Sequence, residues 1–138
     1  MQVLIIGCGW IGRWLSKDLL DKGANVTILD NDPENLRRLS AETEDSELAK
    51  ACILGDGTLR EDLERAGISQ ADVLISTLNR DASNLFTAQL AREVFRVSQV
   101  ICITRGDQAP DVYQSEGIEV LNITRLIGEC LSDSIKGL

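Results

Sequence analysis

The amino-acid sequence predicts a doubly wound α/β fold with a six-stranded parallel sheet and helices on both faces. Three observations support this prediction. Six short runs are apolar at successive positions, which is typical of strands buried on both faces. Each run is followed by a segment of helical periodicity. A glycine-rich turn separates the first run from the first helical segment, and right-handed crossovers then give the doubly wound arrangement.

The expected elements follow one another without a linker or an internal repeat. We expect strands at residues 3–6, 26–29, 51–54, 71–75, 100–103 and 118–121. We expect helices at residues 10–20, from 32–33 onward, and at 59–66, 82–95, 107–115 and 123–135. The charged segment 42–47 is expected to be a helix end or a loop. Residues 1–138 are therefore expected to form a single domain.

Local signals predict several helix ends. Gly23 follows the first helical segment, as a glycine just past a helix commonly does. Asp32 is the expected N-cap of the second helix, and Pro33 suits its first position because the N–H that proline lacks would be unbonded there. Thr58 is the expected N-cap of the helix at 59–66.

Charge and composition narrow the class of function. The formal net charge is −8, so the chain repels phosphodiester backbones and anionic membranes, and we expect neither nucleic-acid binding nor membrane insertion. A bound phosphate would need a local positive field from backbone N–H groups or a few arginines. No apolar run approaches the length of a membrane span, and no secretory signal is visible.

The cysteines and the absence of histidine argue against metal and catalytic sites. Cys8, Cys52, Cys102 and Cys130 are scattered without a CxxC pair, so we expect small buried hydrophobes rather than a zinc site. Free thiols suit a reducing cytoplasm. Histidine, the commonest general acid or base at neutral pH, is absent, and no catalytic residue is predicted.

The strongest motif is the hexapeptide Gly7-Cys8-Gly9-Trp10-Ile11-Gly12. It follows a predicted strand and opens a predicted helix, which makes a GxGxxG pattern specific for dinucleotide-binding Rossmann folds. Gly7 permits the tight turn, Gly9 lets a phosphate approach the backbone, and Gly12 lets the helix pack on the strand. Trp10 and Ile11 complete the predicted phosphate-binding loop at the helix N-terminus. The alternative is a glycine-rich turn without a ligand.

Asp30 ends the second predicted strand, about 20 residues beyond the glycines, where an acid accepts hydrogen bonds from ribose hydroxyls. A carboxylate there also repels a 2′-phosphate. Asn31 belongs to this predicted ribose site, and neither it nor Asp32 is an arginine that would accept that phosphate. The pattern favours NAD(H), ATP, ADP or AMP over NADP. The alternative role of Asp30 is to cap a turn.

These residues, with others downstream, resemble those of the RCK domain (regulator of K+ conductance), also called KTN or TrkA-N. The shared pattern comprises the glycine motif 7–12, Asp30, Gly55-Asp56-Gly57, Thr77-Leu78-Asn79-Arg80-Asp81 with Asn84, and Arg105. The resemblance covers nearly the whole chain. Many dehydrogenases share the glycine motif, whereas the Gly55-Asp56 pair and the segment 81–84 are more distinctive.

The resemblance implies a regulatory function. RCK domains are cytoplasmic parts of K+ uptake systems, channels and efflux antiporters, and they pass a nucleotide-dependent signal to a membrane partner. They assemble as dimers and often as rings of eight domains. We therefore expect a cytoplasmic homodimer or higher oligomer at the inner face of the cell membrane, held there by a K+ transporter or channel subunit. NAD(H) is the first expected ligand, and ADP, AMP or ATP are the others.

The resemblance also implies roles for individual residues. Asp56, between Gly55 and Gly57, would lie near the adenine. Thr77 and Asn79 would face the pyrophosphate or the second ribose, beyond the carboxyl end of the fourth strand. The alternatives are helix capping for Asp56 and ordinary turn hydrogen bonding for Thr77 and Asn79.

Two arginines and one tryptophan bear on where a phosphate would bind and on which nucleotide is expected. Arg105 closes the fifth strand, where it meets a phosphate or is a solvated surface residue. Arg13 lies near a helix N-terminus, whose dipole opposes a cation, so it points into solvent or helps to bind an anion. The ATP-binding branch of the family commonly has an arginine at the place of Trp10. Its absence tilts the expected ligand from a γ-phosphate toward NAD(H) or a shorter nucleotide.

The end of the chain carries two further expectations. Where some family members have an acidic residue for a divalent ion, this chain has Asn122-Ile123-Thr124-Arg125, so no metal is predicted. The last helix has one broad apolar face, which packs on its own sheet or, as the resemblance implies, on a partner subunit.

The main hypothesis is thus a regulatory, non-catalytic nucleotide-binding subunit that controls a K+ transporter or channel. The alternatives are an NAD-dependent oxidoreductase and the cofactor module of a larger enzyme.

Overall fold

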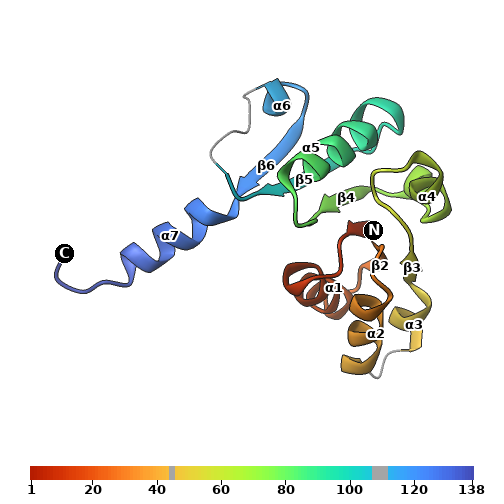
Figure 1. Cartoon of the computed structure of the whole chain (residues 1–138), viewed down its shortest axis with the longest axis horizontal. Helices are drawn as coiled ribbons and strands as arrows, with labels where there is room; N and C mark the ends of the chain where they lie inside the picture. Colours follow the sequence, from red (N-terminus) through yellow and green to blue (C-terminus); the bar gives the residue numbers. More distant parts are fainter. Residues whose placement is uncertain (44–45, 107–111) are drawn as a thin grey trace.

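The computed structural model describes residues 1–43, 46–106 and 112–138. Its strands form one parallel sheet in the order β3-β2-β1-β4-β5-β6 (Figure 1). This is the strand order of a doubly wound Rossmann fold, so the predicted fold class is confirmed. The strands are β1 Gln2–Ile6, β2 Asn25–Asp30, β3 Cys52–Leu54, β4 Val73–Ser76, β5 Gln99–Thr104 and β6 Ile118–Asn122.

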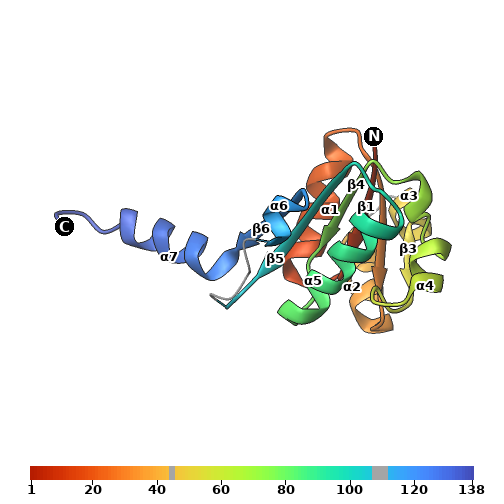
Figure 2. The same ribbon diagram turned by 90° about the horizontal axis from the view of Figure 1, so that it is seen from above.

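Helices cover both faces of this sheet (Figure 2). They are α1 Trp10–Asp21, α2 Pro33–Glu42, α3 Ser46–Lys50, α4 Arg60–Arg65, α5 Asp81–Gln89, α6 Val112–Ser115 and α7 Ile123–Asp133. Residues of α1, α2 and α3 join one apolar cluster, and residues of α4 and α5 join another. Val3 and Ile5 of β1 belong to the first cluster, and Leu4 and Ile6 to the second, because successive strand side chains point to opposite faces.

The expected helix ends are partly correct. Asp32 is the N-cap of α2, and its side chain accepts a hydrogen bond from the N–H of Glu34. Thr58, however, is not the N-cap of α4. That position belongs to Leu59, while the N–H and hydroxyl of Thr58 donate to Asp56. The hydroxyl is thus bonded to Asp56 and does not accept an N–H of the first turn of α4.

The main differences from the expected elements lie in three segments. The helix expected at 82–95 is α5 followed by a π-helical turn, Leu90–Val94. In the charged segment 42–47, α2 ends at Glu42 and α3 begins at Ser46, while residues 44–45 lie outside the described residues. Of the helix expected at 107–115, residues 107–111 also lie outside them, and α6 forms the rest.

The last helix, α7, extends away from the sheet and its covering helices (Figures 1 and 2). None of its residues is buried. Cys130 on α7 is consequently exposed, which contradicts the expectation that each cysteine is a small buried hydrophobe, whereas Cys8 and Cys102 are buried. Within the described ranges, no helix is long and apolar enough to cross a bilayer.

Asn84 fixes the start of α5 against the ends of two strands. Its fully buried side chain accepts hydrogen bonds from the Ser76 hydroxyl and the Leu78 N–H. Its amide nitrogen donates to the carbonyls of Leu78 and Ile103. All four bonding positions of the amide are therefore used, and the loop after β4 is held in one geometry.

Replacing Asn84 should destabilise the fold. Asn84→Ala leaves several buried polar groups without partners, and we expect the free energy of unfolding to fall by about 3 kcal/mol. Urea unfolding followed by circular dichroism measures this loss. Gln99→Ala, at an exposed position of β5, is the control and should change stability by less than about 0.5 kcal/mol. Equal unfolding midpoints for the two variants would contradict the role given to Asn84.

Candidate functional site

The carboxyl ends of β1 and β4 mark the point where the order of the sheet reverses. β1 pairs with β2 on one side and with β4 on the other. The connections that leave β1 and β4 therefore run to opposite halves of the sheet, and a crevice opens between them. The predicted site residues all lie at or just beyond the carboxyl ends of β1 to β5, at this same edge.

The glycine loop joins β1 to α1 in a geometry that side chains would block. Gly7 has a φ of +103°, and a Cβ there would lie 2.8 Å from the carbonyl oxygen of Thr77. A Cβ on Gly12 would collide with the carbonyl oxygen of Gly7, so α1 approaches β1 this closely only with glycine. A Cβ on Gly9 would meet nothing within 4 Å. The N-terminus of α1 is thus open above Gly9, as a phosphate would require.

Thr77 holds this loop from the end of β4. Its hydroxyl lies 3.2 Å from the carbonyl oxygen of Ile6 and 3.1 Å from that of Gly7. Its N–H donates to Ile6 as well, at 2.7 Å. Since the hydroxyl proton points at the loop, Thr77 can offer a ligand only the lone pairs of its oxygen.

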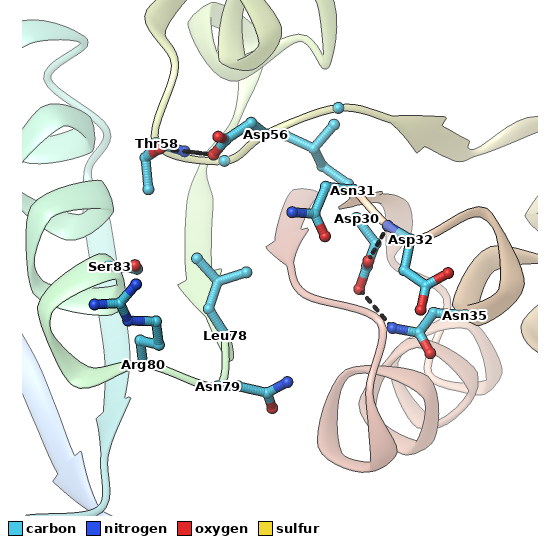
Figure 3. Close-up of a pocket in the computed structure, with 13 residues that line it drawn as sticks. Asp30, Asn31, Asp32, Asn35, Asp56, Thr58, Leu78, Asn79, Arg80 and Ser83 are labelled. Atoms are coloured by element: carbon cyan, nitrogen blue, oxygen red, sulfur yellow. Dashed lines mark hydrogen bonds between the residues drawn. The ribbon is translucent and has the colours of Figure 1, made fainter.

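Asp30 joins the glycine loop to the start of α2. The residue is 6% exposed, and its carboxylate accepts hydrogen bonds from the N–H of Cys8 at 2.6 Å and the N–H of Asp32 at 2.7 Å. The Asn35 amide donates a third, at 3.3 Å (Figure 3). Asp30 therefore closes a turn, and its contact with a ribose stays a prediction. With four lone-pair positions on a carboxylate, one acceptor position on Oδ1 remains beside these three bonds.

The thiol of Cys8 is buried under the loop, 3.5 Å from the carbonyl oxygen of Asn35. Burial, with a smaller contribution from the Asp30 carboxylate, raises the pKa of Cys8 to about 12. The thiol is therefore protonated at neutral pH and is a poor nucleophile and metal ligand. Among the residues that the structure describes, no group of three or more Cys, Asp or Glu side chains is arranged to hold a metal ion.

Asp56 closes the turn that follows β3. Its Oδ1 accepts the N–H of Thr58 at 2.8 Å and the Thr58 hydroxyl at 2.6 Å. Gly57 is sterically required, because a Cβ there would collide with the buried Ile6 side chain. A Cβ on Gly55 would displace the ends of the Arg65 and Asp62 side chains of α4. Asp56 thus holds its turn and does not cap α4, whose N-cap lies three residues further on.

Two cavities lie along this edge of the sheet, and Asn35 and Asn79 line both. The first, called here the acidic cavity, has a volume of about 460 Å³. It is lined by Leu29, Asp30, Asn31, Asp32, Asn35, Gly55, Asp56, Gly57, Thr58, Leu78, Asn79, Arg80 and Ser83 (Figure 3). Its walls come from the loops after β2, β3 and β4, and they carry three carboxylates and one arginine.

The second, called here the arginine cavity, has a volume of about 380 Å³. It is lined by Gly9, Trp10, Ile11, Arg13, Asn35, Arg38, Thr77, Asn79 and Arg105. This lining contains three arginines and no carboxylate. The carboxyl edge of the sheet is therefore electrically polarised, with acids around one cavity and cations around the other.

The structure brings the predicted site residues together around these cavities. All of them line one cavity or both, except Gly7 and Gly12, which shape the loop behind. Binding of a ligand by these residues stays a prediction. Sequence reasoning missed Asn35 and Arg38 of α2. The sequence did contain a pattern that could have identified them. Asn35 and Arg38 are three residues apart on a helix whose N-cap was predicted, so they lie on the same face of that helix.

Arg13 and Arg105, which the sequence left as either solvated or anion-binding, both make contacts within the fold. Arg13 is 7% exposed, so it does not point into solvent; its guanidinium pairs with Glu42 at 3.1 Å and lies 4.9 Å from the centre of the Trp10 ring. Arg105 is half-buried, and its guanidinium donates to the carbonyl oxygen of Leu78 at 2.9 Å. Neither is a freely solvated residue, and both line the arginine cavity.

Sequence comparison identifies close relatives of this chain. The family model of the TrkA-N domain matches residues 3–123. The Trk system potassium uptake protein TrkA of Streptomyces coelicolor is 32% identical over 125 residues, which cover 91% of this chain and 54% of that protein. A TrkA homolog of Methanothermobacter thermautotrophicus is 32% identical over 119 residues, covering 86% of this chain and 52% of that protein. The chain thus spans about half the length of these two relatives.

Solved structures show the same fold. The TrkA-N domain of the inner membrane protein YbaL from Escherichia coli superposes with a TM-score of 0.81 at 18% identity, covering 98% of this chain and 96% of that one. The GsuK channel bound to NAD superposes with a TM-score of 0.77 at 22% sequence identity, covering 96% of this chain and 22% of that one. The structure of GsuK bound to ADP superposes with a TM-score of 0.77 at 22% sequence identity, covering 96% of this chain and 33% of that one.

Alanine at Gly12 should lower stability, whereas alanine at Gly9 should weaken nucleotide binding without lowering stability. Gly12→Ala forces a Cβ against the Gly7 carbonyl, so we expect the free energy of unfolding to fall by about 3 kcal/mol. Gly9→Ala has open space around its Cβ and should change stability by less than about 0.5 kcal/mol, yet it should weaken the binding of an adenine nucleotide. Thermal unfolding and calorimetric titration measure the two effects. Unchanged nucleotide affinity in Gly9→Ala would refute a phosphate at this position.

Proposed function

This chain belongs to the TrkA-N domain family, and on that premise we propose that it is a regulatory nucleotide-binding domain of a K+ transport system. The observation that carries the proposal is the pair of adjoining cavities beside an open glycine loop, with a buried carboxylate at the end of β2. The naming of the two relatives as Trk potassium uptake proteins supports the link to K+ transport. The K+ transporter or channel subunit would be the membrane partner that places the domain at the inner face of the membrane.

The ligand that we propose is an adenine nucleotide, either NAD(H) or one of ADP, AMP and ATP. Its adenosine would occupy the acidic cavity, where the remaining acceptor position of Asp30 suits a ribose hydroxyl. Its first phosphate would lie over Gly9 at the N-terminus of α1, where free N–H groups and the helix dipole favour an anion. The NAD and ADP complexes of GsuK, which shares this fold, are consistent with both kinds of ligand.

We propose that the domain acts by binding and not by catalysis. The polar side chains at the crevice hold backbone: Asp30 holds the glycine loop, Thr77 the end of β1, and Asp56 its own turn. Such a preorganised site binds a nucleotide without a reaction. A regulatory signal then requires only that two arrangements of the assembled domains differ in their affinity for the nucleotide.

The exposed face of α7 supports a homodimer. Leu126, Ile127, Leu131 and Ile135 are between 45% and 64% exposed on this projecting segment. An isolated helix of this length is marginal in water, because tertiary packing supplies most helical stability. We propose that a second copy of the chain covers this face, as an isologous partner.

Nucleotide titration tests the function directly. We expect NADH, NAD, ATP, ADP or AMP to bind the purified chain in calorimetry, and mass spectrometry of the denatured protein should identify a retained nucleotide. Asp30→Asn should weaken binding about tenfold, since a hydrogen bond to a charged acceptor contributes roughly 1.5–3 kcal/mol. Asp21→Asn, which removes the same charge at the far end of α1, is the control. Absence of binding to all five nucleotides would refute the proposal.

Disruption of the α7 face tests the dimer. Leu131→Asp places a charge in the centre of the proposed contact, and we expect a shift from dimer to monomer in size-exclusion chromatography with light scattering. Ser132→Asp, on the same helix, should leave the dimer intact. A monomeric unmodified chain at tens of micromolar (a concentration on the order of weak dimer affinities) would contradict the dimer.

A further inference from the structure

A third cavity, called here the neutral cavity, lies where β6 meets α7. Its volume is about 410 Å³, which is within the range usual for small-molecule sites. It is lined by Thr104, Gln114, Val120, Leu121, Asn122, Arg125, Leu126 and Glu129, which come from β5, α6, β6 and α7. These residues are all different from those that line the acidic and arginine cavities.

The hydroxyl of Thr104 distinguishes this cavity. Thr104 is 1% exposed, and its hydroxyl has no hydrogen-bond partner among the residues that the structure describes. The other buried hydroxyl side chains in the described ranges all donate to an oxygen, namely Ser16, Ser76, Thr77 and Thr87. A buried hydroxyl without a partner costs free energy. Because Thr104 lines the cavity, a molecule bound there can supply the missing bond.

The alternation of side chains along β5 places this hydroxyl inside. Val100 and Cys102 belong to the apolar cluster that α4 and α5 cover, and Thr104, two residues further on, points to the same face of the sheet. Val120 of β6 packs against that cluster and also lines the cavity. Thr104 thus places a polar group at the end of an apolar row, at the point where the row reaches the cavity. Packing alone would favour an apolar side chain there.

The lining carries no net charge. Its charged side chains, Arg125 and Glu129, are one turn apart on α7 and pair at 2.7 Å. A charged molecule in the cavity would give up hydration without meeting an unpaired opposite charge. The other polar side chains are the hydroxyl of Thr104 and the amides of Gln114 and Asn122, which both donate and accept hydrogen bonds.

The amide of Asn122 has hydrogen-bonding capacity to spare. Its nitrogen donates to the carbonyl of Gly106 at 2.9 Å, and its oxygen accepts the N–H of Arg125 at 3.0 Å. An amide side chain has two N–H groups and two lone pairs. Within the described ranges, one donor and one acceptor position of Asn122 therefore remain for a bound molecule.

We propose that the neutral cavity binds a small uncharged molecule that carries an amide or hydroxyl group on an apolar body. Thr104 and Asn122 bind its polar group. Val120, Leu121 and Leu126 contact its apolar part. This site is separate from the proposed nucleotide site. Since α7 forms one of its walls, a bound molecule joins the projecting helix to β5 and β6.

Three molecules of similar size and different charge test the chemistry of the site. Isobutyramide, isobutyrate and isobutylammonium are titrated into the unmodified chain at equal ionic strength and followed by proton–nitrogen correlation NMR. We expect isobutyramide to shift the signals of Thr104, Asn122 and Leu126 with a Kd on the order of 1–10 mM. The two ions should bind at least about fivefold more weakly. Equal binding of an ion, or shifts confined to other residues, would overturn the inference.

Two buried threonines provide a matched pair of variants. Thr104→Val removes the hydroxyl without a partner, so we expect the thermal midpoint of the free chain to rise by about 2–4 °C. It should also weaken isobutyramide binding at least about fivefold. Thr87→Val removes a hydroxyl that donates to the Gly57 carbonyl at 2.9 Å. Its midpoint should fall, and its isobutyramide binding, measured below that midpoint, should not change. A lower midpoint or unchanged binding in Thr104→Val would overturn the site.

Leu131→Asp, the variant that separates the proposed dimer, distinguishes a small molecule from a second copy of the chain. Equal isobutyramide binding by this variant and by the unmodified chain supports a site within one copy. Binding by the variant alone would overturn the inference, because the second copy would then fill the cavity. Failure of all three molecules to bind either protein would also overturn it, while the nucleotide titration would still decide the proposed function.

Discussion

The close approach of three backbone segments at Gly7 is the constraint on which the site depends. The carbonyl of Gly7 lies where a Cβ on Gly12 would be, and the carbonyl of Thr77 lies 2.8 Å from where a Cβ on Gly7 would be. β1, α1 and β4 can therefore meet at one point only because two side chains are missing. Asp30 then fixes the loop from the other side through the N–H of Cys8. The open space above Gly9 is the consequence of this packing, and every proposal about the ligand begins from it.

A second set of polar contacts fixes the opposite wall of the crevice. Asn84 holds the loop after β4, and Asp81 accepts the N–H groups of Arg105 and Gly106, each at 2.9 Å. Asp81 and Asn84 both lie in the first turn of α5, where the helix dipole favours the carboxylate of Asp81. Together these two side chains fix the backbone that positions the guanidinium of Arg105.

The sequence predicted what is local and missed what depends on tertiary contacts. The sheet, the glycine loop and Asp30 follow from runs, spacing and turn chemistry, and the structure has each of them at the expected place. Arg38 could not be singled out, because its role depends on which residues α1 brings opposite α2. Thr58 was assigned to the wrong helix end because its hydroxyl has a nearer acceptor in Asp56. The exposure of Cys130 could not be foreseen because an amphipathic helix does not reveal whether its own sheet covers it.

The proposed site and the projecting helix are joined by a short series of hydrogen bonds. Arg105 lines the arginine cavity, and the next residue, Gly106, accepts a hydrogen bond from the Asn122 amide at 2.9 Å. Asn122 is the N-cap of α7 and accepts the N–H of Arg125. Spatial continuity of this kind does not by itself transmit a signal. Since a ligand shifts an equilibrium only by its difference in affinity for two states, the nucleotide can bias α7 only if the position of Arg105 differs between them. An anionic ligand of the proposed site that competed with the Leu78 carbonyl for the Arg105 guanidinium would provide such a difference, because the guanidinium would then have a different partner in the two states.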